Sequence, residues 1–213
     1  MTYTTDQYKQ YLYDVIEMIE NEKDYLSDLD RKIGDGDHGV TMSIGWQAVK
    51  EKLENELKEE TDGGEISKIV AKTFRNTVGS SVGPLYATGF LRGSKVLKGK
   101  TALADQDLFN FWIAFGEGIK ERGQAEVGDK TMIDSIDPFV QSLKLQRDRQ
   151  SFEHAMDKAL RDAKRGMLST KDMVSKKGRS SRLGDRSKGF QDPGATSAYL
   201  IMECFQKSLS GVK

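Results

Sequence analysis

The stretch Met42-Ser-Ile-Gly-Trp46-Gln-Ala-Val49-Lys-Glu-Lys-Leu53-Glu-Asn-Glu-Leu57 places a large apolar side chain at every third or fourth position. Residues three and four positions apart lie on one side of an α-helix, so this spacing indicates a helix with a single apolar face. Lys and Glu fill most of the other positions in its second half. We therefore expect an amphipathic helix here, with its apolar face in a core.

The same spacing recurs along nearly the whole chain. It appears in seven further segments, at residues 8–19, 66–74, 84–97, 109–119, 136–143, 152–163 and 198–209. No alternating or β-branched run of strand length accompanies them. The sequence therefore predicts an all-α protein, an antiparallel barrel or bundle of eight helices. We expect Pro84, Pro138 and Pro193 to lie at helix starts, where the missing N–H of proline costs least.

Length and composition restrict the class of protein. The 213 residues contain no linker or internal repeat, so we expect one domain over residues 1–213. Hydrophobic residues make up 37% of the chain, enough for a core, which excludes a disordered polyelectrolyte. No apolar run approaches the ~20 residues of a membrane span and no signal-peptide layout begins the chain, so we expect a cytoplasmic protein that binds no membrane. The single cysteine, Cys204, excludes an internal disulfide and a cysteine-rich metal site, and we expect it in the core.

The formal net charge is zero, but the charges are unevenly distributed. Residues 1–60 carry 15 acidic and 7 basic side chains, whereas residues 164–188 carry 9 basic and 2 acidic ones. These runs are consistent with solvated surfaces, and also with an acidic, metal-binding end that meets a basic, anion-binding loop across one site. The chain is neutral overall and its basic segment lacks aromatic residues, which disfavours nucleic acid as a partner.

Three glycine-rich stretches interrupt the helices, at residues 34–39, 79–83 and 173–194. Ordered loops of this kind in a compact domain commonly carry function. They follow the first, third and seventh predicted helices, and in an antiparallel arrangement all odd-numbered helices end on the same side. We therefore expect the three stretches to meet at one rim and to form a shared site.

A cluster of carboxylates lies at the first of these stretches. Asp30, Asp35 and Asp37 fall within eight positions, interleaved with glycines that let the backbone bring several oxygens together. Such a cluster repels itself without a cation, and Mg²⁺ prefers carboxylate oxygens together with water and phosphate oxygens. The alternative is a plain turn in which Asp37 caps the next helix. An EF-hand is excluded because its twelfth position would be Trp46, and no Walker A sequence is present.

The other loops present groups that suit an anion. Gly79-Ser-Ser-Val-Gly83 leads into a helix whose N-terminal N–H groups and dipole favour phosphate, although plain turns have similar sequences. Residues 173–194 combine glycines with arginines, whose planar fork suits phosphate, and end in Asp192-Pro193, which is typical of a helix start. A fourth segment, Gly128-Asp-Lys-Thr-Met132, opens another helix with its Asp or Thr as the expected cap.

Five motifs taken together resemble a known family. They read Gly34-Asp-Gly-Asp-His-Gly39, Gly83-Pro-Leu-Tyr86, Gly128-Asp-Lys-Thr-Met132, Gly178-Arg-Ser-Ser and Gln191-Asp-Pro-Gly-Ala-Thr196. Their order and spacing over nearly the whole chain are similar to those of the nucleotide-binding L subunits of bacterial dihydroxyacetone kinases. The resemblance implies an antiparallel eight-helix barrel with ADP or ATP at one rim, in agreement with the helices predicted from periodicity.

The resemblance also implies roles for individual residues. Asp30, Asp35 and Asp37 would ligate two Mg²⁺ ions that bridge the nucleotide phosphates. Arg179 would reach the nucleotide phosphates. Its place in the basic segment beside Gly178, opposite the acidic loop, leads to the separate hypothesis that it acts on the transferring phosphoryl group, and the alternative treats it as one basic residue interchangeable with Arg182 or Arg186. The nucleotide would be contacted by His38, Thr41, Ser80, Ser81, Gly123, Met132, Arg179, Asp192, Pro193 and Gly194.

Two positions depart from the family pattern. The family usually has Gly-Gly-Ala-Ser-Gly where this chain has Gly79-Ser-Ser-Val-Gly83, so the hydroxyl contact would move from the position of Val82 to Ser80 or Ser81. The family often has Asn where this chain has Thr41, which puts that side-chain contact in question.

The function that the resemblance implies is that of a phosphotransferase subunit. Dihydroxyacetone would be held on a separate K subunit. A phosphocarrier M subunit, supplied from phosphoenolpyruvate, would rephosphorylate ADP that stays bound to this chain. The sequence leaves two other functions open: a kinase subunit that exchanges ATP and acts on another small substrate, and a nucleotide-loaded regulatory protein that catalyses nothing.

Overall fold

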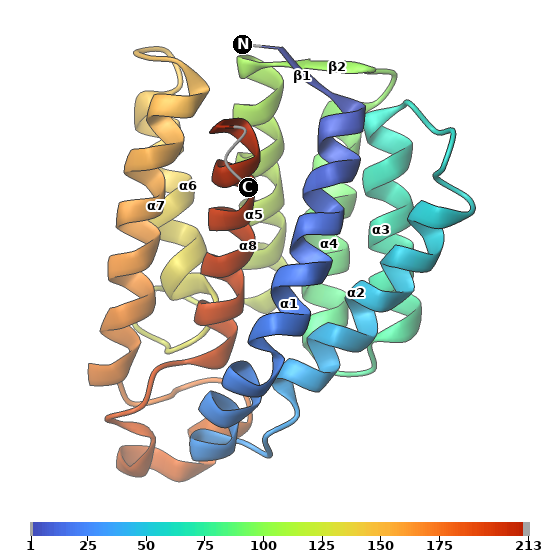
Figure 1. Cartoon of the computed structure of the whole chain (residues 1–213). Helices are drawn as coiled ribbons and strands as arrows, with labels where there is room; N and C mark the ends of the chain where they lie inside the picture. Colours follow the sequence, from blue (N-terminus) through green and yellow to red (C-terminus); the bar gives the residue numbers. More distant parts are fainter. Residues whose placement is uncertain (1, 211–213) are drawn as a thin grey trace.

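The computed structural model describes residues 2–210, and most of them lie in eight α-helices (Figure 1). Two 3₁₀ segments, η1 (Thr170–Asp172) and η2 (Arg179–Ser187), lie in the long connection before the last helix. The predicted all-α class is confirmed, whereas the more specific barrel form stays a prediction. No helix in this range has the length and apolar composition that crossing a membrane requires. The helices are α1 (Thr5–Ile33), α2 (His38–Glu54), α3 (Gly63–Thr77), α4 (Val82–Leu97), α5 (Asp105–Gly123), α6 (Ile133–Gln146), α7 (Phe152–Ser169) and α8 (Pro193–Ser210).

Helices that are consecutive in the chain pack against each other. Each helix from α1 to α7 packs on the next one, and α8 also packs on α1. Neighbouring helices run in opposite directions, so the odd-numbered helices end and the even-numbered helices begin on the same side, the lower side in Figure 1. The connections that follow α1, α3 and α7 therefore lie at one end of the molecule, as the sequence predicts.

The helices enclose one continuous apolar core that is rich in aromatic rings. Trp112 packs edge-on against Phe115, Phe139 and Phe205, with ring centroids 5.3, 5.6 and 5.1 Å apart. These rings come from α5, α6 and α8, so the cluster joins helices that are distant in sequence, and edge-on pairs add to the stability gained by burial. Cys204 is buried in the same core, as expected.

Two three-residue strands depart from the sequence prediction. β1 (Thr2–Thr4) pairs antiparallel with β2 (Ala102–Ala104), and Tyr3 lies opposite Leu103. Three residues are too few to show an alternating pattern, and their pairing depends on helix packing that brings the starts of α1 and α5 together. The strands lie at the end of the molecule opposite to the glycine-rich connections (Figure 1).

Pro138 lies inside α6, and the prediction that it marks a helix start is wrong. A proline inside a helix leaves the carbonyl four residues earlier without its usual N–H partner, and this carbonyl belongs to Asp134. The Asp134 carbonyl oxygen lies against Gly166 of α7, where a Cβ atom would stand 1.8 Å from it. The same Cβ atom would stand 3.3 Å from Pro138 Cγ. The proline therefore lies at a close approach of α6 and α7 that sequence spacing does not reveal.

Replacing Gly166 with Ala is expected to destabilise the fold. The added methyl group has no room unless α6 and α7 separate, and overpacking of this kind costs about 1–3 kcal/mol of unfolding free energy. For a chain of this length, the melting temperature should fall by about 2–4 °C for each kcal/mol. Gly79→Ala is the control, because nothing lies within 4 Å of a Cβ atom there. A Gly166→Ala variant that melts with the wild type would contradict the close approach.

Candidate functional site

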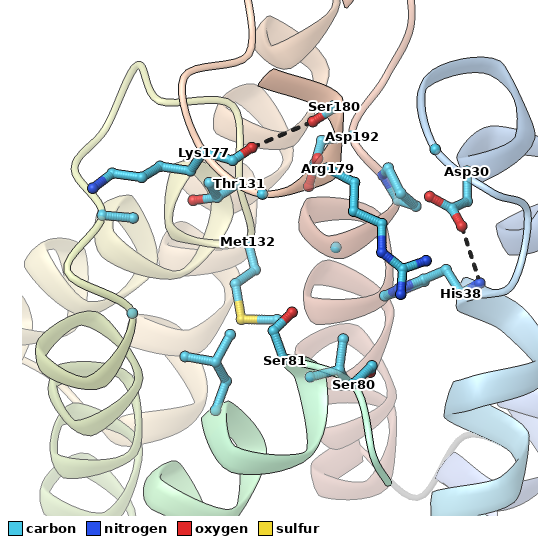
Figure 2. Close-up of a pocket in the computed structure, with 18 of the residues that line it drawn as sticks. Asp30, His38, Ser80, Ser81, Thr131, Met132, Lys177, Arg179, Ser180 and Asp192 are labelled. Carbon is cyan, nitrogen blue, oxygen red and sulfur yellow. Dashed lines mark hydrogen bonds between the residues drawn. The ribbon is translucent and has the colours of Figure 1, made fainter. Parts of the chain in front are cut away.

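One pocket of about 820 Å³ opens at the end of the molecule where the three glycine-rich connections meet (Figure 2). Its walls come from the ends of α1 and α5, the beginnings of α2, α4 and α8, the turn before α6 and the 3₁₀ segment η2. The structure therefore brings together residues from the whole length of the chain, and their individual roles stay predictions. Every site residue predicted from the sequence lines this pocket: Asp30, Asp35, Asp37, His38, Thr41, Ser80, Ser81, Gly123, Met132, Arg179, Asp192, Pro193 and Gly194.

The three aspartates, Asp30, Asp35 and Asp37, form an aspartate cluster in this pocket. One carboxylate oxygen from each lies within 4.8 Å of the other two. Asp30 is in the last turn of α1, and its Oδ2 accepts the backbone N–H groups of Asp37 at 2.9 Å and His38 at 3.2 Å. These bonds fold the connection back onto α1, and Gly36 has a φ of +80° that larger residues rarely adopt. The backbone of the connection thus gathers the carboxylates.

The capping interpretation of Asp37 is confirmed for its position but not for its side chain. Asp37 stands at the N-cap position of α2, but its side chain accepts no hydrogen bond from the helix N-terminus. Burial raises the pKa of Asp37, and the negative charge of Asp30 adds to the effect. The carboxylate therefore faces a repelling neighbour without serving the helix, which favours the interpretation that the cluster receives a cation.

Arg179 of η2 belongs to the basic residues 164–188 and reaches the aspartate cluster. Its guanidinium forms ion pairs with Asp35 and, at 3.4 Å between Nη1 and Oδ2, with Asp37. All three side chains are about half exposed, so these pairs contribute little to stability. One guanidinium leaves most of the charge of three carboxylates uncompensated. The acidic residues 1–60 and the basic residues 164–188 therefore meet in this pocket. This agrees with the interpretation that an acidic end meets a basic loop across one site.

His38 begins α2 directly after the cluster and is buried. Its Nε2 atom is 2.9 Å from Ser197 Oγ on α8. Burial lowers the pKa of His38 to about 4, although the charge of Asp30 acts in the opposite direction. The imidazole is therefore neutral at pH 7 and offers a bound anion hydrogen bonds rather than positive charge. Thr41 lies one turn further along α2 and also lines the pocket.

Two serine hydroxyls precede α4. The Oγ atom of Ser80 is buried and has no hydrogen-bond partner among the described residues. Ser81 stands at the N-cap position of α4, and its side chain forms no capping bond. Both hydroxyls are therefore available to an anion next to the N-terminus of a helix, where backbone N–H groups and the helix dipole also favour negative charge.

Another part of the pocket is apolar. Met132, the residue before α6, is buried, and its side chain points toward Ser81 (Figure 2). Leu85 and Ile133 line the pocket together with Gly123, the last residue of α5. A polar and an apolar part within one pocket suit a ligand that joins a planar organic group to a charged group.

The start of α8 forms a further wall. Asp192 is buried, and its Oδ2 accepts the N–H of Ala195 at 2.7 Å, as expected for a helix cap. Burial raises the pKa of Asp192 to about 7. A Cβ atom at Gly194 would stand 3.1 Å from this carboxylate, so glycine leaves room for the Asp192 side chain at the start of α8.

The turn before α6 is capped differently from the prediction. Thr131 Oγ1 accepts the N–H of Ile133 at 3.1 Å, in line with the expected threonine cap, but Met132 holds the N-cap position. Most of the turn is instead held by Asp134, which lies inside α6. Its carboxylate accepts the N–H groups of Gly128 at 2.6 Å and Thr131 at 2.7 Å.

The pocket also contains cations to which the sequence analysis assigns no role. There are four of them among the described residues, of which Lys130 is buried and Arg122, Lys177 and Arg182 are exposed. Lys130 belongs to the motif Gly128-Asp-Lys-Thr-Met132, and two of the others belong to the positively charged residues 164–188. Basic residues are common on protein surfaces, so neither signal shows which of them lines a pocket.

Comparison with known proteins identifies the family. Residues 32–207 match the family model of the DAK2 domain. The ADP-binding subunit of the PEP-dependent dihydroxyacetone kinase of Escherichia coli is 38% identical over 188 residues, which cover 88% of this chain and 89% of that protein. The chain belongs to the DAK2-domain family of dihydroxyacetone kinase ADP-binding subunits. The ADP-binding subunit of the PTS-dependent kinase of Lactococcus lactis, another member, is 40% identical over 199 residues, 93% of this chain and 95% of that one.

Solved structures share the DAK2 fold. The crystal structure of the dihydroxyacetone kinase of C. freundii matches 94% of this chain with a TM-score of 0.72 and 21% sequence identity. A second structure of that kinase, in complex with AMP-PNP and Mg²⁺, matches with a TM-score of 0.70 and 22% identity. This chain spans about a third of the length of those kinase chains, 34% and 33%. The likeness concerns the fold alone.

Proposed function

We propose that this chain holds ADP together with Mg²⁺, accepts a phosphoryl group from a phosphocarrier M subunit and passes it to dihydroxyacetone on a separate K subunit. The observation that carries the proposal is the meeting of three carboxylates and Arg179 in one pocket that also has an apolar part. The relatives that the chain matches over nearly their full length are named ADP-binding subunits of such kinases. We accordingly treat residues 1–213 as a single nucleotide-binding domain.

The pocket residues fit a magnesium nucleotide. Asp30, Asp35 and Asp37 would hold two Mg²⁺ ions, because Mg²⁺ takes carboxylate oxygens and keeps positions for phosphate oxygens and water. When bound, these ions would neutralise the charge of the phosphates, which is a large part of catalysis in phosphoryl transfer. A volume of about 820 Å³ lies in the range of pockets that bury a ligand of this size.

The polarity of the pocket indicates how a nucleotide would lie in it. The free hydroxyl of Ser80 and the N-terminus of α4 would contact the phosphates. The apolar side chain of Met132 would lie against the adenine. Further contacts would come from His38, Thr41, Ser81, Gly123, Asp192, Pro193 and Gly194.

Arg179 would act on the transferring phosphoryl group. Its side chain is long enough to reach the aspartate cluster, where it pairs with Asp35 and Asp37. If these carboxylates held cations, the guanidinium of Arg179 would be free to contact phosphate oxygens instead. Its planar fork contacts such oxygens with two parallel hydrogen bonds, which suits the charge that develops on them during transfer.

Turnover with partner subunits tests this function. The chain is loaded with ADP, desalted and mixed with dihydroxyacetone, phosphoenolpyruvate, the K subunit, the M subunit and the phosphocarriers that phosphorylate the M subunit. The proposal predicts dihydroxyacetone phosphate without added ATP. Turnover only with added ATP would instead indicate a kinase subunit that exchanges its nucleotide, and no turnover with any K-type partner would indicate a regulatory protein.

Removal of magnesium is expected to destabilise the protein. A ligand that binds only the folded state adds about 4 kcal/mol to the free energy of unfolding at a thousandfold excess over its dissociation constant. A chelator should therefore release the nucleotide and lower the melting temperature by several degrees. Thermal melts before and after chelation, with the released nucleotide quantified, measure this effect. Complete release with an unchanged melting curve would show that the nucleotide does not support the fold.

A further inference from the structure

Lys130 is a buried lysine that the proposed function leaves without a role. Only 1% of the residue is exposed, although it belongs to the turn before α6 and lines the pocket. Its Nζ atom donates to the carbonyl oxygens of Met173 at 3.3 Å, Ser187 at 2.6 Å and Phe190 at 2.6 Å. Three acceptors match the three N–H groups of an ammonium, so the side chain is fully used within the protein.

All three acceptors belong to the part of the chain that carries Arg179. We refer to residues 173–190 as the arginine segment. Met173 lies at its beginning, Ser187 and Phe190 lie at its end, and η2 begins with Arg179 between them. One ammonium therefore joins the two ends of the arginine segment and attaches them to the turn that carries Met132.

Backbone N–H groups donate further hydrogen bonds where the two ends of the arginine segment meet each other and the turn before α6, a region we call the junction. These bonds report whether the junction is closed. The N–H of Ser175 donates to Ser187 Oγ at 2.8 Å, and the N–H of Gly189 donates to the carbonyl oxygen of Lys171 at 2.7 Å. The N–H of Lys176 donates to the carbonyl oxygen of Asp129, in the turn before α6, at 3.0 Å. Amides held in this way exchange with solvent only when the junction opens.

The ammonium of Lys130 is well placed to hold this junction. Burial lowers the pKa of Lys130, whereas the charges of Asp192, Asp134 and Asp172 act in the opposite direction. Hydrogen bonds from a charged donor are about twice as strong as neutral ones. Buried carbonyl groups that lose their donor are unfavourable, so removal of the ammonium would favour opening of the junction to water.

We propose that Lys130 is the positioning residue for Arg179: its buried ammonium holds both ends of the arginine segment so that the guanidinium reaches the aspartate cluster. This inference rests on the proposed function, since that function gives Arg179 its target. A displacement of about 1 Å can lower the rate of a reaction about 100-fold. Turnover is therefore sensitive to the junction even where the helices are intact.

Lys130→Met tests the proposal, because methionine keeps the apolar stem and removes the ammonium. Lys188→Met is the matched control, since Lys188 lies in the same segment with an exposed side chain outside the pocket. Amide hydrogen exchange on the full chain should be roughly tenfold or more faster at Ser175, Lys176 and Gly189 in Lys130→Met, with the helices unchanged. Turnover with the partner subunits should fall about 100-fold. Lys188→Met should match the wild type in both measurements.

A double-mutant cycle separates positioning from general damage. Arg179→Lys already removes the fork that Lys130 positions, so adding Lys130→Met should cause little further loss of turnover. If the fold-losses of turnover in the two single variants multiply in the double variant, the two residues act independently and the proposal is overturned. Unchanged amide exchange in the arginine segment of Lys130→Met would overturn it as well. If the wild type itself shows no turnover, the proposed function fails, and hydrogen exchange alone then decides whether Lys130 holds the segment. If Lys130→Met does not fold, Lys130→Gln is measured instead, because glutamine keeps N–H donors. Its amide exchange in the arginine segment should also be faster than in the wild type, and its turnover should also be lower.

Discussion

Replacing Asp35 with Asn is expected to abolish the retention of nucleotide. The change keeps the size of the side chain and removes one of the three charges that would hold Mg²⁺. Because the phosphates of the nucleotide would be bound largely through these ions, the affinity for the magnesium nucleotide should fall below the level that survives desalting. Nucleotide and magnesium are quantified in the desalted protein.

The fold is expected to survive this change. Asp35 is half exposed and pairs with Arg179, and an exposed pair contributes little to stability. Removal of one charge also reduces repulsion within the aspartate cluster, so the ligand-free variant should keep its helical content and melt no earlier than the wild type. Asp28→Asn is the control, because Asp28 is an exposed acid on α1 that pairs with Arg31 outside the pocket. Retention of nucleotide and magnesium by Asp35→Asn would refute the metal assignment.

Replacing Arg179 with Lys is expected to separate binding from transfer. Lysine keeps the positive charge, so the nucleotide should stay bound, but it lacks the planar fork that contacts two phosphoryl oxygens at once. Arginines that stabilise a transferring phosphoryl group contribute about 10³-fold or more to the rate. Turnover with the partner subunits should therefore fall by about that factor while bound nucleotide, measured after desalting, stays at the wild-type level.

The choice of control for Arg179 depends on the structure. From the sequence, Arg182 and Arg186 are equally good controls, but Arg182 lines the same pocket and Arg186 does not. Arg186 is exposed, so Arg186→Lys should leave both binding and turnover unchanged. Equal turnover by Arg179→Lys and Arg186→Lys would show that the guanidinium of Arg179 has no special part in the transfer.

The helices are predictable from the sequence because each has one apolar face. Residues such as Trp46 and Trp112 lie three or four positions from other apolar residues on the same helix, and both are buried as this pattern predicts. Pro138 is the exception, since its place depends on the contact of α6 with Gly166 of α7 and not on its neighbours in sequence. The pairing of β1 with β2 likewise depends on contacts between parts of the chain that are far apart.

The meeting of the three glycine-rich connections at one end is predictable for a related reason, whereas pocket residues outside them, such as Gly123 and Met132, are predicted through the family resemblance. Antiparallel helices of similar length place alternate connections at one end, so motifs in those connections meet. The detailed contacts do not follow from this rule. The pairing of Arg179 with Asp35 and the burial of Lys130 against three carbonyl groups arise from the path of residues 173–190, which contain no periodic pattern.

The central claim, that the nucleotide stays on this chain with two magnesium ions, is tested most directly by its mass under native conditions. The chain is supplied with ADP and Mg²⁺, desalted thoroughly and weighed by native mass spectrometry. The account predicts a single dominant species with the mass of one chain, one ADP and two magnesium ions, and the loss of all three ligands from Asp35→Asn. A dominant mass of the bare chain for the wild type would contradict it.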